Sequence, residues 1–279
     1  MSAAFPDTSR RSDTGAIRHV LLDIEGTTCP VAFVSEVLFP YSAEALPAYL
    51  AQYGREPELQ PLLQELLAGW RQEEAPEAQD LLTQAHPALP SGQEAGQAFD
   101  AQALIPYLRW LIRRDRKVTA WKDLQGRLWR EGYRSGALQA TLFPEVPDTL
   151  RRWQRQGLGL SVYSSGSVAA QQLLYGHSQA GDLRPLFQHW FDTRIGAKQE
   201  PASYSAILQT LGCGAEAVLF LSDSLAELQA AATVGMAVVF SDRPGNPGRD
   251  PGGFAAISRL DAVDPTRWPH PLPPAQHRV

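Results

Sequence analysis

The side chains best suited to chemistry follow four apolar runs that are typical of β-strands. Residues 18–22 run into "DIEGTT", "GLGLSVY" runs into "SSGS", "AVLFL" runs into "SDS", and a lysine in "IGAKQEP" follows "HWF". Because ligands of open parallel sheets bind at the carboxyl ends of the strands, we expect these groups to meet at one sheet edge. The set comprises acids, hydroxyls and one cation: Asp23, Glu25, Ser164, Ser165, Lys198, Ser222, Asp223 and Ser224.

This combination of groups favours a magnesium-dependent phosphate site. Two carboxylates from different strands, Asp23 and Asp223, repel one another when unpaired, and Mg²⁺ prefers oxygen ligands of this kind. A magnesium ion held by one or two carboxylates keeps water molecules and accepts a phosphate oxygen. Hydroxyls and backbone N–H groups at Ser164 and Ser165 can bind another phosphate oxygen, and Lys198 can hold both the phosphate and the charge of Asp23. We therefore expect the substrate to be a phosphate monoester.

The spacing of Asp23 and Glu25 predicts a different role for each. In an extended segment residues i and i+2 point to the same side, so both carboxylates face the ligand until Gly26 turns the chain. Asp23 would attack phosphorus to form an aspartyl-phosphate, which splits the hydrolysis into two displacements. Glu25 would protonate the leaving oxygen and then deprotonate the hydrolytic water.

Each of these residues, taken alone, also has an ordinary structural explanation. An aspartate after a strand is often a turn former or a helix N-cap, and Ser-Gly-Ser can simply cap the helical stretch that follows it. A lone lysine is usually a solvated charge. The occurrence of all of them, in this order at the ends of strands, favours a site over a series of coincidences.

Strand-like and helical runs alternate after Leu142, which predicts a parallel sheet covered on both faces. Residues 18–22 have the character of the later strands, whereas residues 31–133 show helical periodicity. We therefore expect an α/β fold whose core is a doubly wound, Rossmann-like parallel sheet interrupted by a helical cap. The core takes residues 17–30 and 134–260, the cap residues 31–133, and the peripheral tails residues 1–16 and 261–279.

Within the insertion, apolar residues at intervals of three and four predict helices in residues 34–53, 58–70, 102–114 and 119–133. Residues 71–96 are rich in Pro, Gly, Gln and Glu, which favours a connector or weak helix outside the core. We expect the four tryptophans of the insertion to be packing residues. They are Trp70, Trp110, Trp121 and Trp129. The basic cluster at residues 113–117 is expected to be a solvated helix end.

Composition limits the partners. Hydrophobic residues make up 44% and charged residues 20% of the chain, which is typical of a folded globular protein. The net charge of −5 argues against a nucleic-acid partner, since such proteins carry a clustered basic face. No run approaches the ~20 apolar residues of a membrane span, and the first residues lack the apolar stretch of a signal peptide. Two cysteines, Cys29 and Cys213, give no disulfide framework, so we expect a cytoplasmic protein, and we expect a monomer.

"DIEGTT", "SSGS", the downstream lysine and "SDS", in that order, resemble the haloacid dehalogenase superfamily of aspartate-nucleophile phosphatases, and the helical insertion resembles its cap. Four longer stretches are similar to the enolase-phosphatases of methionine salvage: "LLDIEGTTCPVAFVSEVLFPY", "LQGRLWREGY", "VYSSGSVAAQQLLYGHS" and "FDTRIGAKQEPASY". This resemblance covers residues 18–243. Most of the superfamily carries Asp two positions after the nucleophile, so Glu25 departs from the wider pattern but agrees with the enolase-phosphatase branch.

The resemblance implies a bifunctional reaction on 2,3-diketo-5-methylthiopentyl 1-phosphate. Enolisation, followed by dephosphorylation, would give the acireductone 1,2-dihydroxy-3-keto-5-methylthiopentene. The implied magnesium positions are Asp23, Glu25 (through its backbone carbonyl) and Asp223, and the implied substrate contacts are Ser164, Ser165 and Lys198. The base that drives enolisation is not identified by the resemblance.

Four other interpretations of the sequence stay open. Another capped phosphatase, acting for example on a sugar phosphate or phosphoglycolate, would carry the same groups. A haloacid dehalogenase would need neither a magnesium ligand at Asp223 nor an acid at Glu25. A non-catalytic binding protein would have no need to retain the strand-end acids and Lys198. A nucleotide-binding fold is weakly indicated, because "GLGLSV" lacks the full glycine-rich fingerprint.

Overall fold

The computed structural model describes residues 16–89, 99–116 and 118–267. The chain divides into two compact units, each assembled from separate stretches of sequence. The sheet unit comprises the described residues up to Cys29, residues Phe143–Ser165 and the described residues from Pro185 onward. The helical unit comprises the described residues of Pro30–Leu142 together with Gly166–Arg184.

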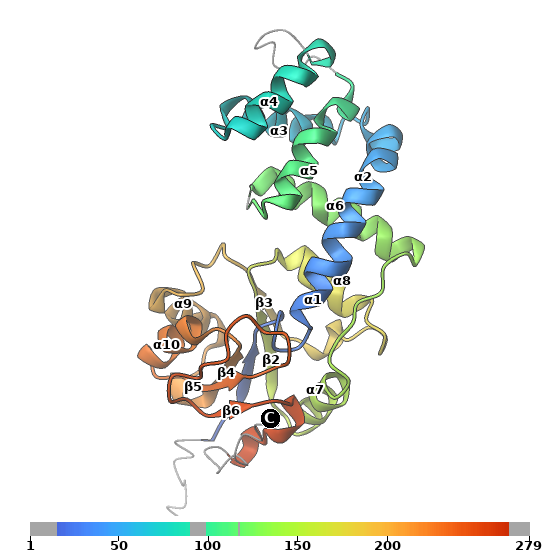
Figure 1. Ribbon diagram of the computed structural model, residues 1–279. Helices are drawn as coiled ribbons and strands as arrows, with labels where there is room; N and C mark the ends of the chain where they lie inside the picture. Colours follow the sequence, from blue (N-terminus) through green and yellow to red (C-terminus); the bar gives the residue numbers. More distant parts are fainter. Residues whose placement is uncertain (1–15, 90–98, 117, 268–279) are drawn as a thin grey trace, which may run out of the picture. The chain divides into compact units, whose positions relative to one another are not determined.

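Six strands among the described residues form one sheet in the order β3-β2-β1-β4-β5-β6, and every neighbouring pair is parallel (Figure 1). They are β1 (His19–Leu22), β2 (Gly159–Tyr163), β3 (His189–Phe191), β4 (Val218–Ser222), β5 (Ala237–Ser241) and β6 (Ala256–Ile257). Leu22 at the end of β1 is level with Val162 of β2 and Leu221 of β4. The carboxyl ends of these three strands therefore lie at the same edge of the sheet.

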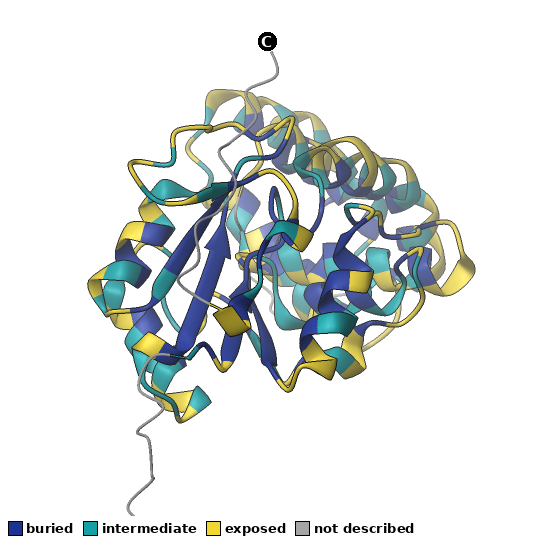
Figure 2. Cartoon of the chain, turned by 90° about the horizontal axis from the view of Figure 1, so that it is seen from below, coloured by how far each residue is buried: buried dark blue, intermediate teal, exposed yellow. Residues whose placement is uncertain are grey.

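The central strands β1, β2 and β4 are short and mostly apolar because both faces of the sheet are covered. Every residue of β1, β2 and β4 is buried, and Figure 2 shows the strands in dark blue between helices. The described residues of this unit form three α-helices: α7 (Val146–Arg155), α9 (Pro201–Leu211) and α10 (Leu225–Thr233). On one face, Ile207 of α9 and Leu228 of α10 pack in a core with Phe220 of β4, while α7 lies on the other face (Figure 1). The predicted doubly wound α/β fold is confirmed.

The described part of the helical unit contains α1 (Val31–Phe33), α2 (Phe39–Tyr53), α3 (Gln60–Gln72), α4 (Pro76–Ala85), α5 (Ile105–Arg113), α6 (Thr119–Ser135) and α8 (Val168–Gly176), with a π-helical segment, Val34–Leu38, between α1 and α2. The unit has an apolar core of its own, in which Trp70, Trp110 and Trp121 are buried among leucines. Trp129 is half-buried, and its indole N–H donates to Ser42 Oγ at 2.8 Å. These four tryptophans are packing residues, as predicted.

Helix α4 lies within residues 71–96, the stretch predicted to be a connector or weak helix. The prediction that this stretch lies outside the core is wrong there, because Ala78 is fully buried and its carbonyl accepts a hydrogen bond from Trp70 Nε1 at 2.9 Å. Leu89 of the same stretch is also buried in this core, and Leu81 and Leu82 pack against it. The end of the stretch, residues 90–96, lies outside the described residues.

The basic cluster at the end of α5 is exposed and is neutralised by neighbouring acids. Arg113 and Arg114 form ion pairs with Glu77 at 3.3 and 2.7 Å, and Arg116 pairs with Glu73 at 2.7 Å. The cluster is therefore a solvated helix end, as predicted, while its last member, Lys117, lies outside the described residues. No helix in the described ranges is long and apolar enough to cross a membrane.

Besides the described part of residues 30–133, the helical unit includes residues 134–142 and α8. The ring of His177, directly after α8, stacks on Tyr133 of α6 with centroids 5.1 Å apart. The carbonyl of His177 also accepts a hydrogen bond from the N–H of Ala140 at 2.9 Å. Contacts between residues distant in sequence thus assign α8 to this unit.

Candidate active site

The β1 loop, defined here as residues 23–29, is a compact turn at the carboxyl end of β1. Three successive N–H groups, those of residues 27–29, donate to the Ile24 carbonyl at 2.9 to 3.1 Å. Gly26 has a φ of +71°, and a Cβ at this position would lie only 2.3 Å from Asp223 Oδ2. Glycine is therefore required here, and its backbone passes close against the Asp223 carboxylate.

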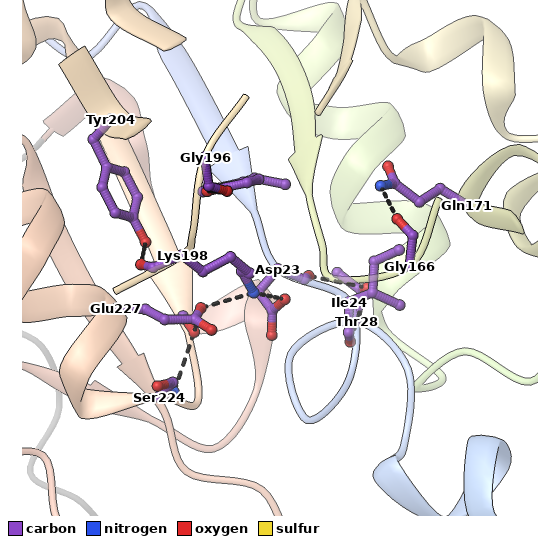
Figure 3. A network of polar contacts seen from close by, with 12 residues as sticks. Asp23, Ile24, Thr28, Gly166, Gln171, Gly196, Lys198, Tyr204, Ser224 and Glu227 are labelled. Carbon is purple, nitrogen blue, oxygen red and sulfur yellow. Dashed lines mark hydrogen bonds and ion pairs between the residues drawn. The ribbon is translucent and has the colours of Figure 1, made fainter. Parts of the chain in front are cut away.

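Lys198 lies between two carboxylates (Figure 3). Its Nζ is 2.5 Å from Asp23 Oδ1 and 2.8 Å from Glu227 Oε2, and the lysine side chain is only 9% exposed. Asp23 comes from the end of β1, Lys198 from the loop after β3, and Glu227 from the first turn of α10. The ordinary explanation of Lys198 as a solvated charge is thereby excluded.

The backbone that carries Lys198 is held in place by three side-chain hydroxyls. Tyr163 of β2 donates to the carbonyl of residue 196 at 2.9 Å, and Ser203 of α9 donates to that of residue 197 at 2.7 Å. Tyr204 of α9 donates to the Lys198 carbonyl at 2.7 Å. Three consecutive carbonyls are thus fixed by the sheet and by α9, so the lysine is positioned before any ligand binds.

Asp223 lies beside Asp23, because the two residues follow neighbouring parallel strands. The Asp23 N–H donates to the carbonyl of Leu221 at 3.0 Å. Burial, followed by the charges of Asp23 and Glu227, raises the pKa of Asp223 to about 7. Burial and the charge of Asp23 also raise the pKa of Glu227, and Lys198 only partly opposes this. Three carboxylates share one ammonium group, so the site carries an excess of negative charge.

Burial alone would lower the pKa of Lys198, but the charges of Asp23 and Glu227 outweigh this effect and raise it. The lysine is therefore held in its charged form at neutral pH. Its ion-pair partners in the structure are both carboxylates.

Glu227 is the site residue that the sequence patterns did not single out. It stands four residues after Asp223, and Ser222 Oγ donates to its Oε2 at 2.8 Å. Ser222 Oγ in turn accepts from the N–H of Ser224 at 3.1 Å, so both serines shape the turn between β4 and α10. The available signal was an aspartate at a strand end followed, one helical turn later, by a glutamate.

The other predicted residues occupy neighbouring loops at the same edge of the sheet. Ser164 and Ser165 follow β2, where Ser164 is buried, donates its N–H to the Phe191 carbonyl at 3.1 Å, and precedes the exposed Ser165. Glu25 is half-buried within the β1 loop, where its backbone pairs with that of Cys29. The structure thus brings Asp23, Lys198 and Asp223 together directly, with the two serines and Glu25 on adjoining loops.

The donor set suits Mg²⁺. No group of three His, Cys, Asp or Glu side chains in the described ranges forms a metal-binding cluster, but Mg²⁺ commonly uses one or two carboxylates plus water and phosphate. Asp23 and Asp223 supply two carboxylates. Asn246 Oδ1 is a further buried acceptor, without a hydrogen-bond partner in the structure, and it lies with Asp223 against Gly26. Acceptor oxygens therefore outnumber hydrogen-bond donors at this site. A hydrated cation would bind the carboxylates and would donate hydrogen bonds through its water molecules.

Comparisons with known proteins agree with this geometry. A family model of haloacid dehalogenase-like hydrolases matches residues 17–235. The enolase-phosphatase E1 of Synechococcus sp. (strain RCC307) is 47% identical over 258 residues, which cover 92% of this chain and 98% of the relative. The enolase-phosphatase E1 of Prochlorococcus marinus (strain MIT 9313) is 46% identical over 244 residues, covering 88% of this chain and 96% of the relative.

A solved structure extends the similarity to three dimensions. The crystal structure of the UTR4 protein from Saccharomyces cerevisiae superimposes with a TM-score of 0.66 at 33% identity, covering 88% of this chain and all of the yeast chain (100%). The match of the family model and the identity to these two relatives each extend over most of the sequence. The chain therefore belongs to the haloacid dehalogenase-like hydrolases and, within them, to the enolase-phosphatases.

Proposed function

We propose that this chain enolises 2,3-diketo-5-methylthiopentyl 1-phosphate and then removes its phosphate, giving the acireductone 1,2-dihydroxy-3-keto-5-methylthiopentene of methionine salvage. The observation that carries the proposal is the similarity, over almost the whole chain, to relatives named enolase-phosphatase E1. The buried network of Asp23, Lys198 and Glu227 beside Asp223 supports the phosphatase half of the reaction.

Asp23 acts as the nucleophile in this proposal. One of its carboxylate oxygens attacks phosphorus, the bond between phosphorus and the substrate oxygen breaks, and an aspartyl-phosphate forms. Water then attacks the phosphorus of this ester, which releases inorganic phosphate and restores the carboxylate. Lys198, already 2.5 Å from Asp23, stays close to the charge that moves from substrate to enzyme and stabilises it.

Glu25 acts as the general acid and then as the general base, and Ser164 and Ser165 bind the phosphate. Glu25 stands two residues after Asp23 in the same loop and is accessible enough to reach solvent. It gives a proton to the leaving oxygen and later takes one from the hydrolytic water. Ser164 and Ser165, at the end of the adjacent strand β2, bind the remaining phosphate oxygens.

The enzyme requires Mg²⁺ in this proposal, in keeping with haloacid dehalogenase-like hydrolases, which are generally Mg²⁺-dependent. Asp23, Asp223 and the backbone carbonyl of Glu25 would hold it. When bound, it neutralises the excess negative charge of the site and draws charge from the phosphate. The crowding of three carboxylates around one lysine supports this assignment.

A cytoplasmic location is also part of the proposal, and both cysteines are free thiols, which suits a reducing compartment. The expected monomeric state and the expected cap boundaries at residues 31 and 133 stay predictions.

The proposal is tested by following two products at once from the diketo-phosphate. We expect the enol chromophore to appear before or together with inorganic phosphate, and both signals to vanish in excess chelator. Phosphate release without an enol signal, together with faster turnover of phosphoglycolate or a sugar phosphate, would identify the chain as another capped phosphatase. Absence of phosphate release from every phosphate monoester would favour the non-catalytic alternative.

A further inference from the structure

The turn after β5 holds the β1 loop through the carbonyl of Gly26. This oxygen accepts a hydrogen bond from Ser241 Oγ at 2.9 Å and another from Asn246 Nδ2 at 3.1 Å. Asn246 Nδ2 also donates to the carbonyl of Ser241 at 3.0 Å, and both residues are buried. Because both acceptors are backbone carbonyls, the amide nitrogen must face them, so the orientation of the asparagine is fixed.

The amide oxygen of Asn246 therefore lies on the side of the amide group that faces away from these two carbonyls. It is buried and has no hydrogen-bond partner in the structure. A Cβ at Gly26 would lie 2.8 Å from this oxygen and 2.3 Å from Asp223 Oδ2, so both oxygens lie against the same face of Gly26. Leaving a buried acceptor without a hydrogen-bond donor is unfavourable, so we expect a donor to occupy this position in the working enzyme.

The missing partner must donate a hydrogen bond next to a carboxylate. The neighbouring backbone oxygens and the Asp223 carboxylate, in the ionised form that a metal ligand takes, only accept hydrogen bonds and therefore do not satisfy Asn246 Oδ1. A water molecule of a hydrated cation donates through both protons and is drawn to carboxylates. Mg²⁺ dehydrates reluctantly and keeps several waters when protein carboxylates bind it.

We propose that Asn246 is a positioning residue of the magnesium site. Its Nδ2 fixes the Gly26 turn of the β1 loop, and its Oδ1 accepts a hydrogen bond from a water molecule of the hydrated magnesium ion. This inference rests on the proposed function, since it takes Asp23 and Asp223 to be the magnesium ligands. It gives the turn after β5 a role at the magnesium site.

The competing explanation is that Asn246 only braces the β1 loop. Ser241 offers the matched control, because Ser241→Ala removes a hydrogen bond to the same Gly26 carbonyl and leaves the Asn246 oxygen in place. Asn246→Ala removes both functions. Asn246→Leu has nearly the shape of asparagine, and serves as a second variant in case the alanine variant does not fold.

The experiment measures Mg²⁺ affinity without substrate, by isothermal titration calorimetry and by the Mg²⁺ dependence of thermal stability. For Asn246→Ala and Asn246→Leu we expect affinity to fall by about 10–100-fold, the usual cost of losing a group that orients a metal's shell. For Ser241→Ala we expect a much smaller change. Saturating Mg²⁺ should restore most of kcat in the asparagine variants, because the chemical groups are intact.

Two outcomes would overturn the inference. One is an equal loss of affinity in the Ser241 and Asn246 variants, which would leave only the bracing role, and the other is unchanged affinity in the Asn246 variants. Failure of the proposed function is distinguishable from both, since the wild-type enzyme would then bind no Mg²⁺ in the same titration or release no phosphate.

Discussion

At the scale of single residues, Lys198 is a residue whose role the sequence alone does not indicate but the contacts in the folded chain do. One lysine in a loop is uninformative, yet here three elements bury it between Asp23 and Glu227, and three hydroxyls fix its backbone. Desolvating an ammonium group is costly, and it is tolerated only when opposite charges remain close. Because the burial of Lys198 is costly, we expect this lysine to have a role in the reaction.

Replacing Lys198 by Met should reduce kcat/KM by about 10²–10³-fold, comparable to the loss of one preorganised donor at a reaction centre. Thermal stability should also fall, because Asp23 and Glu227 lose their counter-charge, and added Mg²⁺ should restore part of it. Steady-state kinetics and thermal unfolding check both effects. Lys122→Met, in α6, is the control, and wild-type kinetics in the Lys198 variant would contradict the assignment.

Glu227→Gln tests the third member of the network. The amide keeps the shape and can still accept a hydrogen bond from Lys198, but the charge is lost. We expect kcat to fall by about 10–100-fold, as for other residues that orient a catalytic or metal-binding group. Ser222→Ala removes a contact to the same carboxylate and should have a smaller effect. Equal kinetics of the Glu227 variant and the wild type would show that the glutamate only anchors α10.

At the scale of elements, the sequence predicts strands well where both faces are buried and poorly where contacts are few. The aliphatic runs of β1, β2, β4 and β5 were recognisable because buried parallel strands are continuous apolar segments. Strand β6 has only two residues, Ala256 and Ile257, and no local pattern marks so short a pair. Helix α8 was recognisable as a helix, but the unit to which it belongs depends on contacts with α6.

The candidate site was predictable to a similar extent. Asp23, Lys198 and Asp223 stand directly at strand ends or in strand-end loops, where topology alone brings them together. Glu227 and Asn246 lie one helical turn and one loop beyond a strand, and only the folded chain brings them back to the sheet edge. Their roles depend on tertiary contacts that spacing does not encode.

The pairing of β1 with β2 buries a histidine, which predicts a dependence of stability on pH. His19 accepts or donates a hydrogen bond with Ser161 Oγ at 2.8 Å, and burial, together with the nearby His189, lowers its pKa to about 4. Because the unfolded chain binds this proton with a pKa of about 6.5, the folded state is favoured above pH 6.5 and loses this advantage as the pH falls to 4.

The size of this effect is about 3 kcal/mol, at 1.36 kcal/mol for each unit of pKa difference. Urea unfolding of the wild type between pH 7 and pH 4 should show the loss, and His19→Gln, which keeps a hydrogen-bonding group without titrating, should lose correspondingly less. Parallel pH profiles for the two proteins would show that His19 is not the group responsible.

At the scale of the whole molecule, the two compact units interleave in sequence, and the described residues of each unit form a hydrophobic core. Leu108 of α5 is fully buried in the core of the helical unit, and Leu150 of α7 is fully buried in the sheet unit. Each Leu→Ala substitution should lower the free energy of unfolding by about 2–5 kcal/mol. Urea unfolding followed by tryptophan fluorescence measures this, and a loss below 1 kcal/mol at Leu108 would contradict an independent core there.

The central claim is that a phosphoryl group passes through Asp23 at the carboxyl edge of the sheet. The most direct test is to quench the enzyme with acid during turnover, reduce acyl phosphates with borohydride, and locate the modified residue by mass spectrometry. We expect Asp23 to be converted to homoserine when substrate and Mg²⁺ are present, and we expect no conversion at this position in excess chelator or in Asp23→Asn, which should also release no phosphate. Phosphate release by the wild type with Asp23 unmodified, or full turnover by the asparagine variant, would contradict the account.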